Sequence, residues 1–543
     1  MPGRFFRPIP VPYPHFMAFA PLDAWWRLLH RPRARVPLAY WPRLAFGLFT
    51  SVLGTALTLP ERLVLAPVLR RAARRSGLRL THVPGVVVIL GYYRSGTTHL
   101  HYLMSCDPRM RTPTWCETLA PQGFALSWAF LRVFMIPFVS ATRPQDDVAI
   151  GPEWPAEDDF AVNNWTLCSA LPGRFVLPRL HGFYDRFHSL AGLSGEERAR
   201  WRWTQWAFCW KVAALARRKR LLLKTPSHTA RVAALDELFG GNVKFIHISR
   251  EPGAVVKSNV TMASRLGVYA LEPRDEADDV RRRIEMEYLD TERRYLEESR
   301  GLGPGRCAEM RYEDLVADPM GELRRVYGEL GIAWSAEFER RAVSYLASVR
   351  EYRAATPAKG GGAAAGLSHE LAALSARFGH DRPARQTVDL PAESAAGREP
   401  RCTRALAAGL GVAAACFVVW VAQAYVLRDR HDWLAWPVGV LIGWTMIRAA
   451  RVGSGLLGWC AAALTFLVFV AIACPSTFLM DYAHRTAPID YRGLPMRDWE
   501  WWHILKASRV GLMAWNNLFW GFMGCVTAYR FASRELVNPP GTG

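Results

Sequence analysis

Between residues 82 and 380, short apolar runs alternate with longer stretches in which apolar positions recur at helical spacing. The short runs, rich in β-branched and aliphatic residues, are typical of strands buried in a sheet; they are 86–90, 221–223, 244–248 and 307–311. The helical patterns are 201–215, 230–239, 278–298 and 321–330. This alternation predicts an α/β fold in which helices cover a parallel sheet.

The last part of the chain has a different pattern, with long apolar runs at 405–427, 433–447, 455–480 and 510–529. Runs of this length are typical of transmembrane helices, so we expect an all-α transmembrane bundle of about four helices over 405–530, a tail at 531–543, and a linker at 381–404. Arginines lie before the first run, between the second and third, and after the fourth, at Arg401, Arg404, Arg448, Arg451, Arg530 and Arg534. The positive-inside rule then predicts a multi-pass membrane protein with residues 82–380 and the C-terminus on the cytoplasmic side and 481–509 outside.

Residues 1–81 form a basic, aromatic region; its apolar run 44–59 is ended by Pro60, Glu61 and Arg62, and a basic amphipathic stretch follows at 63–75. A run this short favours a helix in the membrane interface, because a span needs ~20 residues; a span, or a helix packed on the next domain, are the alternatives. Residues 1–80 carry 13 Arg against Asp23 and Glu61. Tryptophans interleaved with these arginines favour an anionic membrane surface over nucleic acid as the partner.

Composition sets wider bounds on the chain. It has 543 residues and a net charge of +20, which predicts two or more domains. The ten cysteines show neither a C-x-x-C pair nor Cys/His metal spacing, so we expect reduced thiols and no metal. No apolar stretch precedes a small-residue cleavage site, so no secretory signal is expected.

The stretch 85–106 combines the strand at 86–90, a loop bounded by Gly91 and Gly96, and the start of a helix. Free backbone N–H groups and the positive end of a helix then face one anion. The glycine spacing is that of a P-loop, but Thr97 stands where a nucleoside-triphosphate hydrolase needs a lysine, and the cation is Arg94 inside the loop. This indicates a nucleotide phosphate site without γ-phosphate chemistry.

A second strand–turn–helix pattern runs through 244–258 and places Arg250 and Ser258 eight residues apart, so that both can hold one phosphate. Together the two patterns resemble the phosphate-binding elements of the PAPS-dependent sulfotransferase family, most closely its broad bacterial branch. The stretches 154–160, 221–231 and 310–319 also fit that family, and the resemblance covers about 82–380. It implies a three-layer, P-loop-like fold, with a 5′-phosphosulfate loop at Arg94, Ser95, Gly96, Thr97 and Thr98 and a 3′-phosphate site at Arg250 and Ser258.

Sulfuryl transfer needs cations at the leaving phosphate and a base at the acceptor. Arg94 supplies the first cation, and Lys224, at the end of an apolar strand, is the candidate for the second. Glu117 and Glu157 are both candidates for the base, and the sequence does not choose between them. His228, four residues after Lys224, is a further candidate for contact with acceptor or donor.

The sequence thus predicts a membrane-anchored sulfotransferase that moves a sulfuryl group from PAPS to a hydroxyl or amine, without a metal. A membrane lipid or glycolipid is the expected acceptor, and nucleic acid is not an expected partner. A degenerate P-loop kinase or NTPase and a non-catalytic nucleotide-binding scaffold are the alternatives. Lys359, in the Gly-rich stretch 355–366, is either a counterpart of the element that closes over the 3′-phosphate in some relatives or part of a plain linker.

Overall fold

The computed structural model of the chain describes residues 15–80, 83–127, 131, 135, 143, 150–216, 218–273, 277–349, 369–383, 402–427, 434–450, 456–470 and 515–532. The chain forms two compact units. The first, here called the α/β unit, is built chiefly from Pro12–Arg132 and Ser140–Ser394, and the second, the C-terminal helical unit, chiefly from Ala395–Val537. Lys359, the linker residues 384–401 and the segment 481–509 lie outside the described residues.

The α/β unit is organised around a sheet of five parallel strands in the order β2-β3-β1-β4-β5. The strands are β1 (Val86–Leu90), β2 (Met110–Arg111), β3 (Arg220–Lys224), β4 (Val243–Ser249) and β5 (Cys307–Arg311). The four predicted strands are confirmed, and β2 was missed because two residues give no periodic signal. Since Val88 pairs with both Leu223 and Phe245, the carboxyl ends of β3, β1 and β4 meet at one edge.

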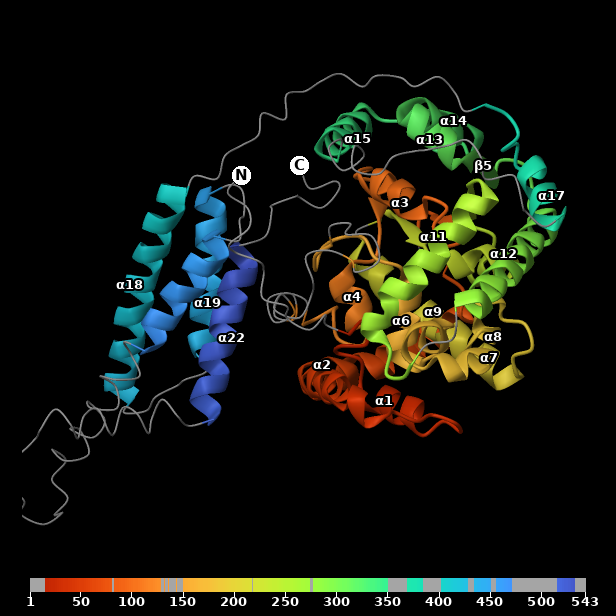
Figure 1. The fold of residues 1–543 in the computed structure, drawn as a ribbon. Helices are drawn as coiled ribbons and strands as arrows, with labels where there is room; N and C mark the ends of the chain where they lie inside the picture. Colours follow the sequence, from red (N-terminus) through yellow and green to blue (C-terminus); the bar gives the residue numbers. More distant parts are fainter. Residues whose placement is uncertain are drawn as a thin grey trace, which may run out of the picture. The chain divides into compact units, whose positions relative to one another are not determined.

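The central strand β1 divides its side chains between two apolar cores because successive residues point to opposite faces. Val86, Val88 and Leu90 belong to the larger core, whereas Val87 and Ile89 belong to the smaller. The larger core is built with α9 (Gly195–Leu215), α10 (Val232–Leu238), α11 (Pro252–Arg265) and α12 (Ala277–Ser299). The smaller is built with α3 (Thr97–Ser105), α14 (Pro319–Glu329) and α15 (Ala336–Ser348). These helices lie on both faces of the sheet (Figure 1), which confirms the predicted three layers.

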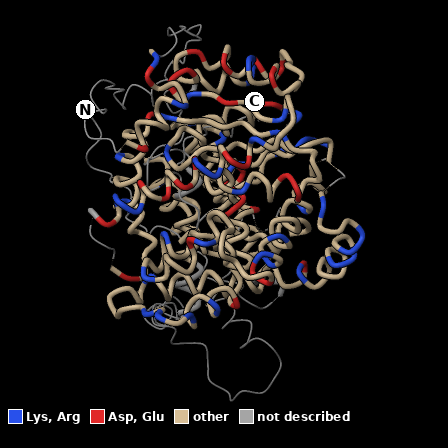
Figure 2. Tube along the Cα trace, turned by 90° about the vertical axis from the view of Figure 1, so that its right-hand side faces the viewer, with Lys and Arg blue, Asp and Glu red and all other residues tan. Residues whose placement is uncertain are grey.

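Short helices complete the α/β unit. They are α1 (Leu22–Leu29), η1 (Leu38–Tyr40), α4 (Trp115–Leu119), α6 (Asp158–Thr166), η3 (Pro172–Val176), η4 (Pro178–Leu180), α7 (His181–Tyr184), α8 (Arg186–Ser189), η5 (Pro226–Ala230), η6 (Leu266–Tyr269), α13 (Tyr312–Ala317) and α17 (His369–Arg377). The helix predicted at 230–239 is therefore shorter than expected, since η5 occupies its start. Acidic and basic residues are interspersed over most of the described chain (Figure 2), but residues 15–80 carry only two acids, Asp23 and Glu61.

The apolar run 44–59 and the basic stretch 63–75 belong to one helix, because α2 runs unbroken from Trp41 to Ser76. A proline removes one N–H donor but does not end a helix whose flanking residues are held by tertiary contacts. Thr58 packs on Gly123, and Glu61 binds backbone groups of 125–127. Only one side of α2 is buried against the α/β unit, so the packing is compatible with an interfacial helix.

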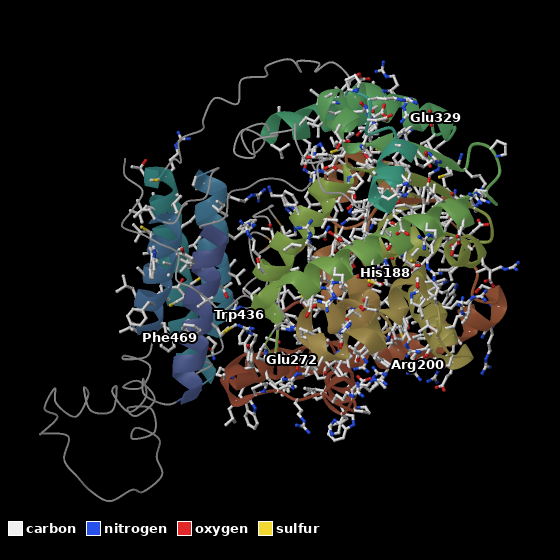
Figure 3. All side chains as sticks on the ribbon, turned by 45° about the vertical axis from the view of Figure 1, so that its right-hand side comes forward. His188, Arg200, Glu272, Glu329, Trp436 and Phe469 are labelled. Atoms are coloured by element: carbon white, nitrogen blue, oxygen red, sulfur yellow. The ribbon has the colours of Figure 1, made fainter. Side chains whose placement is uncertain are left out.

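The C-terminal helical unit contains α18 (Cys402–Leu427), α19 (Ala435–Ala450), a helix at 456–470 and α22 (Trp515–Ala532), which share one apolar core. Gly439 and Gly524 let α19 and α22 approach closely, since a Cβ on Gly439 would lie 2.1 Å from the Gly524 carbonyl oxygen. Trp436 and Phe469 lie in this unit (Figure 3). Within the described residues, Leu38–Ser76 and Cys402–Gln423 are the helical segments long and apolar enough to cross a bilayer, so the structure does not show a four-span bundle.

Candidate active site

The segment after β1 has the strand–loop–helix geometry that the glycine spacing predicts. Arg94 and Gly96 have φ values of 71° and 93°, which bend the chain so that α3 starts at Thr97. A Cβ on Gly96 would lie 2.2 Å from the Tyr312 ring, so a side chain cannot replace this glycine without moving that ring. No side chain caps the first turn of α3, which leaves its N–H groups and the positive end of the helix for an anion.

The second predicted phosphate element lies against the first. The Arg94 Nε donates to the Ser258 Oγ at 3.0 Å, and the Arg250 Nη1 donates to the Arg94 carbonyl oxygen at 3.2 Å. The Arg250 guanidinium also covers the Tyr312 ring at 4.8 Å. Glu251 accepts hydrogen bonds from the first-turn N–H groups of α11, so an anion here would be held by the Arg250 and Ser258 side chains.

Lys224 ends β3 and is buried at the same edge of the sheet, as the sequence predicts for its position. Its Nζ lies 2.5 Å from the Glu157 Oε1 and 3.4 Å from the Thr98 Oγ1. Burial lowers the pKa of Lys224, and the Glu157 charge opposes that shift. The edge therefore presents a cation and a partly exposed carboxylate directly beside the phosphate loop.

His228 lies beneath this pair and has no exposed surface. Its Nε2 lies 2.7 Å from the Asp158 Oδ2, and Asp158 also accepts from Gln205 at 2.6 Å and Thr225 at 2.9 Å. Burial alone would raise the pKa of Asp158, but His228 and these hydrogen bonds hold it below its usual value. Direct contact of His228 with an acceptor has no support in this geometry, and the ring instead orients the residue that follows Glu157.

Glu117 is fully buried in a helix cap. Its Oε2 accepts from the Thr114 N–H at 2.8 Å, and its Oε1 pairs with Arg111. These contacts satisfy both carboxylate oxygens, in contrast to Glu157, which contacts Lys224. Of the two candidate bases, the structure brings Glu157 to the predicted cation.

Three side chains at this site were missed in the sequence. The Arg143 Nη1 donates to the Thr98 Oγ1 at 3.3 Å, and the Arg174 guanidinium covers the Tyr93 ring at 4.2 Å. Only seven of the 68 basic residues are Lys, so a single Arg carries no signal in this chain. Tyr93 could have been found from the sequence, because it lies between Gly91 and Gly96 in the predicted phosphate loop.

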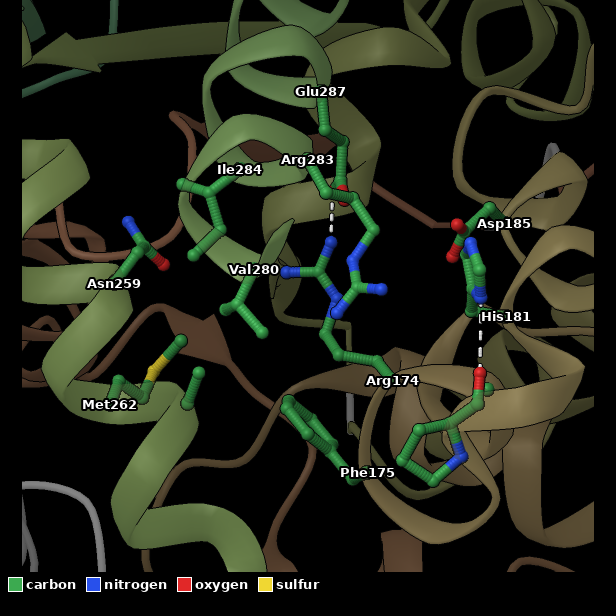
Figure 4. Close-up of a pocket in the computed structure, with 13 residues that line it drawn as sticks. Arg174, Phe175, His181, Asp185, Asn259, Met262, Val280, Arg283, Ile284 and Glu287 are labelled. Carbon is green, nitrogen blue, oxygen red and sulfur yellow. Dashed lines mark hydrogen bonds and ion pairs between the residues drawn. The ribbon is translucent and has the colours of Figure 1, made fainter. Parts of the chain in front are cut away.

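A pocket opens beside the second phosphate element (Figure 4). Asn259, which follows Ser258, lines it and donates to the Tyr93 carbonyl oxygen at 2.8 Å. One wall is apolar and the other charged; the lining includes Phe175, Met262, Val280 and Ile284 on the first and Arg174, Asp185, Arg283 and Glu287 on the second. Burial raises the pKa of Asp185 to about 6, with the Glu287 charge adding and Arg174 opposing.

Behind the charged wall lies His188, deep in the α/β unit (Figure 3), with its Nδ1 3.5 Å from a Glu287 oxygen. In the described part of the chain, no three His, Cys, Asp or Glu side chains are grouped closely enough to bind a metal ion.

Comparison with known proteins shows the family of the chain. A model of the sulfotransferase family matches residues 84–336. The omega-hydroxy-beta-dihydromenaquinone-9 sulfotransferases Stf3 of Mycobacterium bovis and Mycobacterium tuberculosis are each 33% identical over 338 residues, which is 61% of this chain and 82% of theirs. Two similar solved structures are sulfotransferase STF9 from Mycobacterium avium (18% identity, TM-score 0.44, 68% of this chain and 98% of that one) and sulfotransferase STF1 from Mycobacterium tuberculosis (16%, 0.43, 67% and 93%).

The chain belongs to the sulfotransferase family. It is an enzyme that transfers a sulfuryl group to an acceptor, and this membership favours that function over the kinase and scaffold alternatives.

Proposed function

We propose that PAPS is the sulfuryl donor and that it binds across the two phosphate elements. The observation that carries this is the hydrogen bond between Arg94 and Ser258, which joins the loop after β1 to the helix after β4. The residues present fit the donor, because uncapped N–H groups at the start of α3 suit one phosphate and the Arg250 and Ser258 side chains suit another. When bound, PAPS would supply an activated sulfuryl group on its 5′-phosphate.

Lys224 and Arg94 are proposed to stabilise the charge that develops on the leaving phosphate. Glu157 is proposed as the base that takes the acceptor proton, because it is the candidate carboxylate that contacts Lys224 and keeps some exposure. Asp158 and His228 hold the start of α6 and thereby orient Glu157. Glu117 is proposed to act as a structural cap.

The acceptor is proposed to be an amphiphilic molecule with a hydroxyl group. The name of the Stf3 relatives says that they act on a hydroxylated menaquinone, and the pocket in Figure 4 pairs an apolar wall with a charged one beside Asn259. Val280→Trp would narrow this pocket from its apolar wall. We expect it to raise the KM for the acceptor and to leave the KM for PAPS unchanged, as measured by initial rates with each substrate varied in turn.

The membrane topology is also a proposal. We propose residues 82–380 as the catalytic domain on the cytoplasmic side, with several passes through the membrane at 405–530. The arginine placement along the C-terminal third and the apolar helix Cys402–Gln423 support it. Labelling of single cysteines introduced at 381–404 and 481–509, with a membrane-impermeant reagent on sealed and opened vesicles, tests the predicted sides.

The donor is tested by calorimetry with the full-length chain. Adenosine 3′,5′-bisphosphate should bind tightly, AMP weakly, and the binding should fall at least tenfold in Arg250→Ala. Arg324→Ala is a matched control, since Arg324 is exposed and pairs with Glu339. Preference for ATP over the bisphosphate, or equal loss in both variants, would overturn the proposed donor site.

A further inference from the structure

Helix α2 buries its polar side and exposes its apolar side, the reverse of a helix in a soluble protein. Its buried residues are small or polar apart from one leucine: Gly47, Thr50, Ser51, Gly54, Thr58, Glu61 and Leu69. The Ser51 Oγ accepts from the Trp25 Nε1 at 2.6 Å. A Cβ on Gly54 would lie 2.5 Å from the Phe19 Cα, so this side of α2 is closely packed on the chain beneath it.

The opposite side of α2 is a continuous apolar surface. Five exposed large hydrophobic residues are spaced by 8, 3, 7 and 4 positions, so at 3.6 residues per turn they lie on one side of the helix: Trp41, Phe49, Val52, Leu59 and Leu63. Val64 and Val68 are also exposed, nearer the C-terminal end of α2. Leu63 is 68% exposed. From Trp41 to Leu63, at 1.5 Å per residue, this surface is about 33 Å long, so it is a contiguous apolar patch and not a set of scattered single residues.

Glu61 fixes which side of α2 faces outward. Its carboxylate accepts backbone hydrogen bonds from Ala125 and Leu126 at 2.8 Å and from Ser127 at 2.9 Å. It also pairs with Lys211 of α9 at 3.2 Å, and both side chains are only 1% exposed. Because separating α2 from the α/β unit would leave two buried charges unpaired, the helix stays along the unit and does not leave it to cross a bilayer.

The surroundings of the apolar surface are basic. Five exposed arginines follow its C-terminal end, at Arg70, Arg71, Arg74, Arg75 and Arg79, and Arg33 and Arg35 are exposed near its other end. Asp23 and Glu61 are the acids in residues 15–80, and Glu61 is buried. Trp41, the first residue of α2, is exposed, and so is Trp26 of α1; tryptophan prefers the boundary between water and lipid.

We propose that the outward side of α2 lies in the plane of an anionic membrane surface. The apolar side chains enter the outer part of the lipid layer, and the flanking arginines contact the headgroups. A bilayer is the occupant favoured by charge, because the exposed residues around the surface complement anionic lipid. This proposal does not depend on the donor or the acceptor.

Photocrosslinking of the full-length chain tests it. The photoreactive residue p-benzoylphenylalanine replaces Val52 or Leu63, and in a matched control it replaces Met286, an exposed apolar residue of α12. The protein is reconstituted in vesicles of phosphatidylcholine with 30% phosphatidylglycerol and irradiated, and adducts are identified by mass spectrometry. We expect lipid adducts at 52 and 63 in at least fivefold higher yield than at 286.

Adducts to residues 402–532 or to a second copy of the chain would overturn the proposal, as would yields equal to that at 286. A second measurement separates in-plane docking from a span. Glu61→Ala should lower the thermal unfolding midpoint of the reconstituted protein by several degrees, because α2 is packed on the α/β unit. An unchanged midpoint would mean that α2 has left that unit and would overturn the in-plane geometry.

Discussion

At the scale of single residues, environment separates two carboxylates that look equivalent in the sequence. Glu117 has both oxygens bound in a helix cap, whereas Glu157 shares a 2.5 Å contact with Lys224 at the sheet edge. Only a carboxylate that can reach the reacting atoms can act as a base. Glu157 is therefore the better placed of the two to act as a base, because of its position at the sheet edge and its contact with Lys224.

Glu157→Gln and Glu117→Gln should therefore differ in their effect on kcat. Glu157→Gln keeps the shape but removes the proposed base, so we expect kcat to fall by about 100-fold; because the buried Lys224 also loses its charge partner, the unfolding midpoint should fall as well. Glu117→Gln leaves Arg111 without its charge partner and weakens the cap, which should cost about 2 kcal/mol of stability with little change in kcat. Steady-state kinetics and urea unfolding of both variants measure this; the reverse pattern would make Glu117 the base.

The buried His15 should make the stability of the fold depend on pH. Burial lowers the pKa of this histidine to about 4, and a hydrogen bond to the Tyr269 carbonyl oxygen only partly opposes the shift. Because the unfolded chain binds the proton near pH 6.5 and the folded chain does not until about pH 4, stability falls as pH falls through this window, by up to about 1.4 kcal/mol per pH unit.

Urea unfolding at pH 7 and pH 5 checks this. The loss of stability between the two should be smaller in His15→Asn than in the natural chain, and the exposed His30→Asn should not reduce it. Equal losses in all three proteins would mean that His15 is not a source of the pH dependence.

At the scale of elements, the phosphate loop depends on backbone geometry more than on its side chains. Gly96 has φ 93° and lies against the Tyr312 ring, so the loop and α13 fix each other. Residues other than glycine rarely adopt this φ, and the position that a Cβ would take is already occupied by the Tyr312 ring.

Gly96→Ala should therefore lower the affinity for adenosine 3′,5′-bisphosphate by at least tenfold, because the loop must shift away from Tyr312. Gly303→Ala is the control, since a Cβ there meets no atom within 4 Å. Calorimetry measures the affinity of both variants for adenosine 3′,5′-bisphosphate. An unchanged affinity in Gly96→Ala would show that the loop does not hold the donor.

The attachment of α2 gives a second prediction at this scale. Glu61→Ala leaves Lys211 buried without its partner, and we expect a loss of about 3 kcal/mol in the free energy of unfolding. The loss for Asp23→Ala should be under about 0.5 kcal/mol, because its pair with Arg27 is exposed to solvent. Denaturant unfolding in detergent measures both, and similar small losses would argue against the buried pair.

At the scale of the whole molecule, the N-terminal region and the sheet share one core. Phe16, Trp25, Leu28 and Leu69 are buried in the same apolar cluster as β1 and α9. The start of the sulfotransferase match at residue 84 therefore does not mark the start of the folded unit.

A chain that begins at residue 82 should consequently fail to fold stably. Loss of even two large buried side chains costs about 6 kcal/mol or more, comparable with the whole stability of a domain. Thermal unfolding of chains beginning at residue 15 and at residue 82 tests this. A cooperative transition at the same temperature in both would show that the N-terminal region is dispensable for the core.

The sequence by itself determined the features that depend on neighbouring residues. The strand–loop–helix at 86–105, the end of β3 at Lys224 and the four main strands follow from local apolar patterns and glycine spacing. These features predicted the α/β fold and the order of its elements, because each is specified within about twenty residues.

Tertiary structure decided the rest, because the partners lie far apart in the chain. Lys224 meets Glu157 across 67 positions, and Glu61 meets Ala125 across 64. No local pattern predicts which carboxylate contacts a cation. Nor does one predict that tertiary contacts of Thr58 and Glu61, on the buried side of α2, keep the helix continuous through Pro60. Burial of those polar groups must be matched by hydrogen bonds that only the folded chain provides. The continuation of α2 through Pro60, the contact of Glu157 with Lys224 and the outward apolar side of α2 were therefore set by the fold.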